Sequence, residues 1–369
     1  MPGAGPLGLY VHVPFCSGKC GYCDFTSFPG QERLVPRYLA ALSAEAAAAS
    51  LPREPETLYV GGGTPSQLSA AQIAELFARL RQAFPRARFS EVTFEANPES
   101  VDPDKLAALR RAGVTRLSLG LQTLDDGLLR AIGRRHTARD SLRAFSQACS
   151  AGHWSVSVDL ICGLPGQTLA VFLEDLDATL AVGPDHLSLY GLDVHEGTPL
   201  ARQGFAPDED LGRDMLEAAV DRTAAAGLKH YEISNFARPG HESRHNLNYW
   251  TAGEYLGLGC GASSHIAGER RRNAADLGEY LRLVESGAPA TAESERLEGK
   301  DKLGEKVFLG LRRVAGLELE PAMEREFGRE WEDLERRGLV TRHGGRARLT
   351  REGLFLANEA FASFVAPFG

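Results

Sequence analysis

The chain has 369 residues, of which 43% are hydrophobic and 24% charged, and its formal net charge at pH 7 is −8. This length accommodates one large domain and a smaller one. The negative charge argues against nonspecific binding to nucleic acid or to an anionic membrane, and the sequence has no apolar run of membrane-spanning length.

The N-terminal stretch MPGAGPLGLYVHV has no basic lead-in and no small-residue cleavage site of the kind a secretory signal carries. We therefore expect a cytoplasmic protein. Residues 8–13 predict a first β-strand, and three cysteines follow it directly: Cys16, Cys20 and Cys23. The other three cysteines are scattered among small or apolar neighbours, so the chain does not predict a disulfide framework.

Short apolar or β-branched runs alternate with amphipathic stretches from residue 7 to about residue 230. The runs predict six strands, each followed by a helix, at 8–13, 57–61, 91–95, 116–121, 155–161 and 186–192. Cap-type residues predict four helix starts, at Ser69, Asp102, Thr137 and Thr168. Six such units predict a parallel α/β sheet, either flat and doubly wound or curved into a partial barrel. We prefer the partial barrel because of where the unusual residues fall.

Residues 286–300, SGAPATAESERLEGK, are small and polar and predict a linker. We therefore expect a first domain over residues 1–285 and a second over 301–369. The second domain contains three or four helical patterns and a small hairpin, which is similar to a winged-helix domain. Basic and acidic residues nearly balance from Lys300 onward, which favours packing or partner docking over DNA binding.

Polar or glycine-rich residues follow the carboxyl end of every predicted strand, which is where parallel α/β proteins bind their ligands. Each residue alone has an ordinary structural explanation, since a glycine run can be a tight turn and a carboxylate a helix cap. Their shared location predicts one site. In chain order the residues are the three cysteines, Gly61–Pro65, Glu95, Gln122, Asp159, and Tyr190 with Asp193.

Thiolates bind zinc ions or iron–sulfur clusters, and both usually take four ligands. A structural zinc site commonly uses two C-x2-C-like pairs, and this sequence has no second pair. A zinc site completed by His12 stays open. Three cysteines around a four-iron cluster would leave one iron without a protein ligand, and that iron could bind a small molecule.

The spacing C-x3-C-x-aromatic-C, with Tyr22 as the aromatic residue, resembles the signature of the radical S-adenosylmethionine (SAM) superfamily. Several segments are similar, in order, to those of its oxygen-independent coproporphyrinogen III oxidase-like family: HVPFCSGKCGYCDF, VGGGTPSQL, FEANPES, SLGLQTLDD, IGRRH, DLICGLPGQT and LSLYGLDVHEGTPL. The resemblance runs from about residue 7 to the C-terminus. It implies a partial (βα)6 TIM-like barrel of the radical SAM type with a smaller C-terminal α+β winged-helix-like domain.

The resemblance also implies the bound groups, a [4Fe-4S] cluster and SAM. The implied cluster ligands are Cys16, Cys20 and Cys23. Arg134 is implied to meet the SAM carboxylate and Asp159 the ribose hydroxyls, contacts that a guanidinium and a carboxylate can make. The full set of implied SAM-binding residues is Tyr10, Tyr22, Gly62, Gly63, Thr64, Glu95, Gln122, Arg134 and Asp159.

The family contains dehydrogenases that decarboxylate coproporphyrinogen III, and HemW-type heme chaperones that pass heme to apo-hemoproteins. The dehydrogenases typically carry one more cysteine two positions after the motif and a longer N-terminal extension. Here Cys23 is followed by Asp24 and Phe25, so dehydrogenase activity is not expected. We favour a heme chaperone with apo-hemoprotein clients and an electron donor of unknown identity. A radical SAM enzyme acting on a porphyrinogen is the alternative.

Residues 230–265 resemble the chaperone branch, whose HNxxY segment is connected with heme binding. In this chain the segment is His245, Asn246 and Tyr249. On a helix His245 and Tyr249 share one side, and both residue types ligate heme iron. Alternatively, the segment closes the open side of the barrel and His245 is hydrogen-bonded internally.

Overall fold

The computed structural model describes residues 5–152 and 154–365. Its main sheet has twelve strands in the order β14-β13-β12-β11-β1-β4-β5-β6-β7-β8-β10-β9. The six predicted strands form its parallel centre, and each end agrees with the prediction within one residue. They are β1 (Gly8–Val13), β4 (Thr57–Gly62), β5 (Glu91–Ala96), β6 (Arg116–Gln122), β7 (Ser155–Cys162) and β8 (His186–Gly191).

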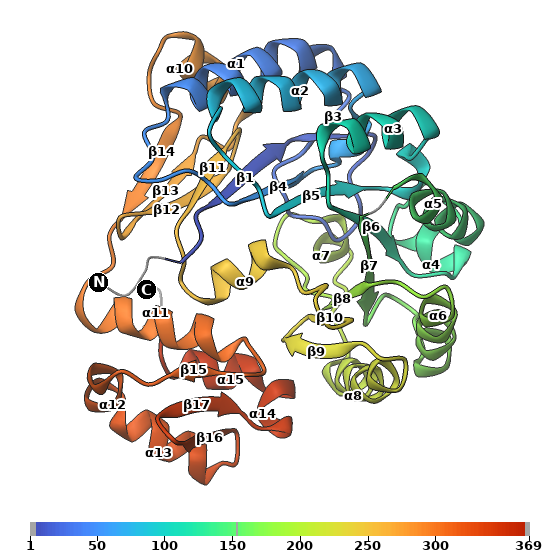
Figure 1. Cartoon of the computed structure of the whole chain (residues 1–369). Coiled ribbons are helices and arrows are strands. Elements are labelled where there is room, and N and C mark those ends of the chain that lie inside the picture. Colours follow the sequence, from blue (N-terminus) through green and yellow to red (C-terminus); the bar gives the residue numbers. More distant parts are fainter. Residues whose placement is uncertain (1–4, 153, 366–369) are drawn as a thin grey trace.

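The sheet curves into the expected partial barrel, with most helices along its outer side and α9 (Arg244–Trp250) on its inner side (Figure 1). Local cap chemistry starts the outer helices where the sequence predicts. The Ser69 hydroxyl accepts from the Gln72 N–H at 3.2 Å, and the Asp102 carboxylate accepts from the Lys105 N–H at 2.8 Å. The helices of the barrel are α1 (Val35–Ala48), α2 (Ala70–Ala83), α3 (Pro103–Ala112), α4 (Asp126–Ala131), α5 (Ala138–Ala151), α6 (Leu169–Ala181), α7 (Pro199–Arg202), α8 (Glu209–Ala225) and α10 (Leu277–Glu285).

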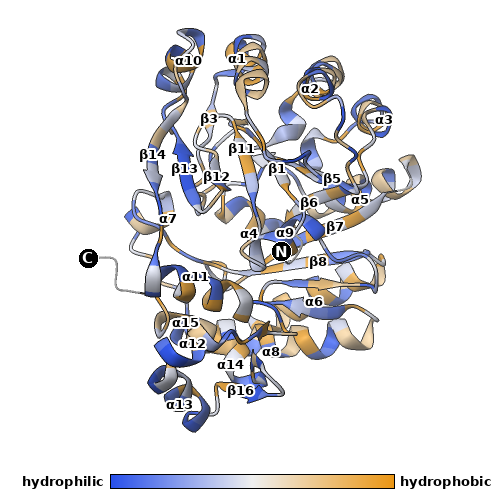
Figure 2. Ribbon diagram, turned by 60° about the vertical axis from the view of Figure 1, so that its left-hand side comes forward, coloured by the Kyte–Doolittle hydropathy of each residue, from blue (hydrophilic) through white to orange (hydrophobic). Residues whose placement is uncertain are grey.

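Strands that the sequence analysis did not predict extend the sheet at both ends. β11 lies parallel to β1, and β12 to β14 continue antiparallel from it, while β10 pairs antiparallel with β8. These strands lack an apolar alternation, and Figure 2 shows β13 largely in the hydrophilic colour. The added strands are β9 (Lys229–Glu232), β10 (Asn235–Ala237), β11 (Tyr255–Leu258), β12 (Ser263–Ile266), β13 (Glu269–Asn273) and β14 (Thr291–Glu295).

The expected linker, residues 286–300, is partly regular structure. Strand β14 lies within it and pairs with β13, and α11 (Gly299–Leu311) begins at its end. The linker expectation is therefore corrected for residues 291–295, because backbone pairing with β13 orders a stretch whose composition indicates a loop. The division of the chain into residues 1–285 and 301–369 stays a prediction.

The C-terminal region has its own small sheet and core. The sheet has the order β15-β17-β16, and β16 and β17 form the expected hairpin. Trp331 and Phe327 are buried in a separate hydrophobic cluster. Helix α11 contacts the barrel at α9, where the Arg312 guanidinium lies 4.3 Å from the centre of the Trp250 ring. The further elements are β15 (Leu317–Glu318), α12 (Pro321–Glu326), α13 (Gly328–Arg336), β16 (Val340–His343), β17 (Arg346–Leu349), α14 (Arg351–Phe355) and α15 (Ala357–Ala362).

Across the ranges that the structure describes, we find no helix whose length and apolar character would let it cross a membrane.

Candidate metal and cofactor site

The three clustered cysteines lie on a loop, residues 16–28, that follows β1 and is called the thiol loop below. Its ends are brought together by pairing of β2 (Phe15–Cys16) with β3 (Phe28–Pro29). In its middle the Gly21 N–H donates to the Ile132 carbonyl, and the Gly21 carbonyl accepts from the Leu200 N–H, both at 2.9 Å. All three thiols are free. The loop is therefore fixed at its ends and its centre, which orients the thiols.

Burial disfavours the thiolate form of two of these cysteines. Burial raises the pKa of Cys16, and it raises the pKa of Cys23 to about 11. Arg134 supplies one positive charge, because its Nη1 lies 3.7 Å from Cys20 Sγ. Metal binding displaces thiol protons, so a bound metal group would supply the remaining charge.

His12 does not offer a free nitrogen to complete a zinc site. Its Nε2 is hydrogen-bonded to the Thr26 carbonyl at 2.7 Å, and its Nδ1 to the Tyr10 hydroxyl at 3.0 Å. Within the described residues, no three Cys, His, Asp or Glu side chains converge as they would around a single metal ion. Three thiols spread along one loop suit a larger group, such as an iron–sulfur cluster.

The glycine run after β4 packs its backbone against the thiol loop. Gly62 has a left-handed backbone with φ of 113°, and a Cβ there would lie 2.6 Å from the His12 ring. A Cβ on Gly63 would lie 3.1 Å from Cys16 Sγ and 3.0 Å from the Phe15 carbonyl oxygen. Glycine is needed at both positions, and it brings the peptide groups of this turn next to the cysteines.

Two carboxyl groups, Glu95 on β5 and Asp159 on β7, lie at the same end of the sheet. Glu95 Oε1 accepts from the Tyr59 hydroxyl at 2.6 Å, and Oε2 accepts from the Gly62 N–H at 3.2 Å. Asp159 accepts from the Ser118 hydroxyl at 3.1 Å. Burial raises the pKa of Glu95 to about 7 and that of Asp159 to about 6, and the nearby Asp159 charge adds to the shift of Glu95.

The raised pKa of Glu95 predicts that the ligand-free protein loses stability as the pH rises. Its folded-state pKa of about 7 lies above its ordinary value of 4.5. Its contribution to stability is therefore complete below pH 4.5 and is lost as the pH rises through 7. The loss amounts to about 3 kcal/mol, at about 1.4 kcal/mol per pKa unit. Urea unfolding at several pH values measures it. Glu95→Gln should remove the part of the dependence that Glu95 contributes, while Asp159, whose pKa is raised to about 6, keeps its own part. An identical pH profile in both proteins would contradict the assignment.

Gln122 and Arg134 complete the polar wall of the site. Gln122 ends β6 with a left-handed backbone (φ of 70°), next to an irregularity in the pairing with β7. Such backbone strain in a residue other than glycine often marks a functional site. Arg134 donates to the Gly120 carbonyl at 2.6 Å and to Asn97 Oδ1 at 2.9 Å. Its buried Nε has no hydrogen-bond partner among the described residues, which leaves donor capacity for an acidic group.

These side chains surround a cavity of about 410 Å³, called the cofactor cavity below. Its volume is within the range of small-molecule sites. Tyr10 is not among the residues that line it, and its role stays a prediction. The predicted residues that do line the cavity are Cys16, Cys20, Tyr22, Cys23, Gly62, Gly63, Thr64, Glu95, Gln122, Arg134 and Asp159.

The sequence analysis missed two residues that organise this site. Asn97, which holds Arg134, follows β5 directly and could have been found by the strand-end argument that selected Glu95. Tyr59, which holds Glu95, lies inside an apolar strand, and no sequence signal distinguishes it from a core residue.

The residues of the cofactor cavity fit an iron–sulfur cluster together with SAM. The thiol loop lies on one wall, the peptide groups of the glycine turn lie beside it, and the unsatisfied Arg134 Nε suits a carboxylate. The carboxyl groups of Glu95 and Asp159 can accept from the amino and hydroxyl groups of such a ligand.

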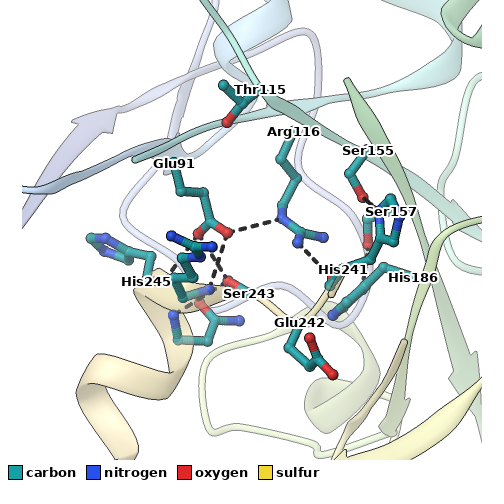
Figure 3. Close-up of polar contacts among 12 residues, drawn as sticks. Glu91, Thr115, Arg116, Ser155, Ser157, His186, His241, Glu242, Ser243 and His245 are labelled. Atoms are coloured by element: carbon teal, nitrogen blue, oxygen red, sulfur yellow. Dashed lines mark hydrogen bonds and ion pairs between the residues drawn. The ribbon is translucent and has the colours of Figure 1, made fainter. Parts of the chain in front are cut away.

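Helix α9 lies at the opposite end of the central strands, anchored by a buried carboxylate (Figure 3). Glu91, the first residue of β5, accepts from the backbone N–H groups of Arg244 and His245, both at 3.0 Å. Arg116, the first residue of β6, has its Nε 3.5 Å from Glu91 Oε2 and donates from Nη2 to the His241 carbonyl at 2.6 Å. The Glu91–Arg116 pair thus fixes the start of α9 against the sheet.

His245 has no exposed surface and is hydrogen-bonded through both ring nitrogens. Its Nδ1 is bonded to the Thr57 hydroxyl at 2.8 Å and its Nε2 to the Tyr249 hydroxyl at 2.7 Å. Burial lowers the pKa of His245 to about 3, so the imidazole is neutral. His245 and Tyr249 do share one side of α9, but they contact each other. These contacts agree with the alternative from the sequence, in which the segment closes the open side of the barrel and His245 is hydrogen-bonded internally. Heme binding by His245, Asn246 and Tyr249 stays a prediction.

Fold and site together define a radical SAM protein. A model of the radical SAM superfamily matches residues 10–179, and a model of the HemN C-terminal domain matches residues 297–356. The heme chaperone HemW of Bacillus subtilis is 36% identical over 96% of this chain and 98% of that protein. The heme chaperone HemW of Mycobacterium tuberculosis is 41% identical over 97% of this chain and 94% of that protein. The chain therefore belongs to the HemW family of radical SAM proteins.

The fold also matches a solved structure. The coproporphyrinogen III oxidase HemN from Escherichia coli, a radical SAM enzyme, superposes with a TM-score of 0.86 at 26% identity. The match covers 98% of this chain and 90% of that one, so it includes both the barrel and the C-terminal region.

Proposed function

We propose that this protein is a heme chaperone that binds heme and delivers it to apo-hemoproteins, and that it carries a [4Fe-4S] cluster and a SAM site. The observation that supports this most strongly is the similarity, over nearly the whole chain, to relatives that are named heme chaperones. The residues after the thiol motif agree with it. Asp24 and Phe25 follow Cys23, and the further cysteine typical of the dehydrogenases is absent from that position.

In this proposal Cys16, Cys20 and Cys23 hold three irons of the cluster, and the fourth iron is free for SAM. A reduced cluster would supply one electron to the SAM sulfonium, and the C–S bond would break to release methionine and a 5′-deoxyadenosyl radical. The protein's own part is to bind and orient. Arg134 pairs with the SAM carboxylate, and Asp159 accepts from the ribose hydroxyls. The backbone of Gly62, Gly63 and Thr64 receives the amino group. Tyr22, Glu95 and Gln122 line the rest of the cavity, and Tyr10 lies beside SAM in this proposal.

The heme site of this proposal is the α9 segment, His245, Asn246 and Tyr249. A neutral imidazole is the form that ligates heme iron, and the environment of His245 keeps it neutral. Ligation requires the imidazole to give up its hydrogen bond to Tyr249 or to Thr57. Heme binding therefore includes a local rearrangement of α9. The clients are apo-hemoproteins, the electron donor is unknown, and the location is the cytoplasm.

Heme titration tests the chaperone function and the ligand together. Wild-type protein is expected to give a heme Soret band, and His245→Ala to shift this band and weaken heme binding at least about tenfold, about 1.4 kcal/mol. His343→Ala is the matched control, because His343 is an exposed histidine on β16. An unchanged spectrum in His245→Ala would exclude His245 as the ligand, and a wild-type protein without a Soret band would contradict the proposed function.

The alternative function is a radical SAM enzyme that acts on a porphyrinogen, which the structural likeness to HemN favours. Incubation with coproporphyrinogen III, SAM and a reductant separates the two functions. We expect no protoporphyrinogen from this protein. Its formation would favour the radical SAM enzyme over the heme chaperone.

A further inference from the structure

We infer that Tyr59 is a positioning residue that couples the cofactor cavity to His245, so that SAM in the cavity strengthens heme binding at α9. The inference rests on the proposed function, because it concerns the same heme and SAM sites.

Tyr59 lies in the middle of β4 and contacts both sites. Its hydroxyl donates to Oε1 of Glu95, a residue that lines the cofactor cavity, at 2.6 Å. Its ring lies 5.3 Å from the His245 imidazole, measured between ring centres, with 33° between the planes. One side chain therefore connects the cavity at the carboxyl end of the strands with the helix at their amino end.

The imidazole at the far end of this connection has two possible arrangements. In the structure both of its nitrogens are bonded, to Thr57 and to Tyr249. To ligate iron it has to release one of these bonds. Because the Tyr59 ring packs against the imidazole, a shift of that ring changes the relative free energies of the bonded and released arrangements. A ligand that moves Tyr59 therefore changes the population that can bind heme.

SAM can move Tyr59 through Glu95. SAM carries a sulfonium and an amino group, and positive charge in the cavity favours the ionised form of the Glu95 carboxyl. A carboxylate only accepts hydrogen bonds, so its bond from the Tyr59 hydroxyl becomes charge-assisted and stronger, at a distance of 2.6 Å that already suits such a bond. The stronger bond holds the Tyr59 ring on the side of the cavity, so that the imidazole can separate from the ring at a lower free-energy cost. Heme binding should therefore be stronger when SAM is bound.

Two heme titrations of cluster-loaded protein, with and without saturating SAM, measure the coupling. No reductant is added, so that SAM is bound but not consumed. For wild-type protein we expect the heme Kd to be about fivefold lower with SAM, and the SAM Kd to be lower by the same factor with heme. Tyr59→Phe keeps the ring and removes only the hydroxyl that reaches Glu95. In this variant the ratio of the two heme Kd values should fall to within about twofold of one.

Tyr231→Phe is the matched control. Its hydroxyl is bonded to His186 Nε2 at 2.8 Å and accepts from the Ser243 N–H at 3.2 Å, so it supports the start of α9. Tyr231 is not among the residues that line the cofactor cavity. Loss of this hydroxyl should change both heme Kd values by the same factor and leave their ratio at the wild-type value. A purely structural role of Tyr59 would give that same result in Tyr59→Phe.

The outcomes separate this inference from the proposed function. The coupling would be overturned, with the chaperone function left intact, if SAM did not change the heme Kd of the wild-type protein or raised it. The coupling would also be overturned if Tyr59→Phe kept the same ratio of heme Kd values as the wild type. A wild-type protein that binds no heme at all would overturn both. If Tyr59→Phe does not fold, Glu95→Leu removes the acceptor at the other end of the bond. With saturating SAM, this variant should also bring the ratio of the two heme Kd values to within about twofold of one.

Discussion

Replacing Cys16 by alanine is expected to abolish binding of the iron–sulfur cluster. Wild-type protein reconstituted without oxygen should hold about four iron and four sulfide per chain, and Cys16→Ala close to none. Cys16 is the most buried of the three thiols, and its Sγ lies 3.3 Å from the Thr64 hydroxyl, against the glycine turn. The two remaining thiols are too few to hold the cluster, and His12 is engaged through both nitrogens. Iron and sulfide analysis with visible absorption spectra gives the measurement.

Cys149→Ala is the control for this prediction. Cys149 is an exposed free cysteine on α5, on the outer side of the barrel, and its loss should leave the iron and sulfide content at the wild-type level. Equal iron content in wild type and Cys16→Ala would falsify the assignment of the thiol loop. Zinc in place of iron in the wild-type protein would also contradict the assignment of an iron–sulfur cluster to the thiol loop.

Glu91→Gln is expected to lower the free energy of unfolding by about 3 kcal/mol, because it leaves a buried positive charge without its partner. The side chains of Glu91 and Arg116 are 7% and 6% exposed. Glutamine keeps the shape and one oxygen acceptor but removes the negative charge. Arg116 Nη1 has no hydrogen-bond partner among the described residues, so the guanidinium has little other compensation. The start of α9 also loses a carboxylate that favours helix N-termini.

Urea unfolding measures this loss, and hydrogen exchange locates it. The amides of Arg244 and His245, which donate to Glu91, should exchange faster in the variant. Glu285→Gln is the control, since Glu285 forms an exposed pair with Arg37 that should contribute little to the free energy of unfolding. A loss in Glu91→Gln no larger than in Glu285→Gln would show that the buried pair does not anchor α9.

The central sheet could be predicted because its signals are local. Strands such as β1 and β4 are nearly continuous apolar runs, since helices cover one face and the barrel interior covers the other. Helix starts such as Ser69 and Thr137 are set by a side chain within three residues of the backbone group that it caps. The polar strand β13 could not be found in this way, because only its pairing with β12 and β14 makes it a strand.

The cofactor cavity could be predicted because parallel strands place their carboxyl ends together. That rule alone predicts that Glu95, Gln122 and Asp159 lie beside the thiol loop, and all three line the cavity with it. It says nothing about side chains within the sheet, and so Tyr59 was missed. It also could not decide between the two environments of His245. The decisive partner, Thr57, is 188 positions away in the chain and meets His245 only in the folded barrel.

The first strand of the barrel pairs with a strand from far along the chain. Tyr10 is opposite Tyr59 of β4 on one side and Gly257 of β11 on the other. At about 5–20 residues per second, a ribosome needs roughly 13 to 50 s to reach β11. During that time one edge of β1 has no permanent neighbour, and the cysteines that follow it are accessible in the nascent polypeptide. Translation in air therefore exposes these cysteines to oxidation before β11 pairs with β1, and anaerobic expression avoids this exposure.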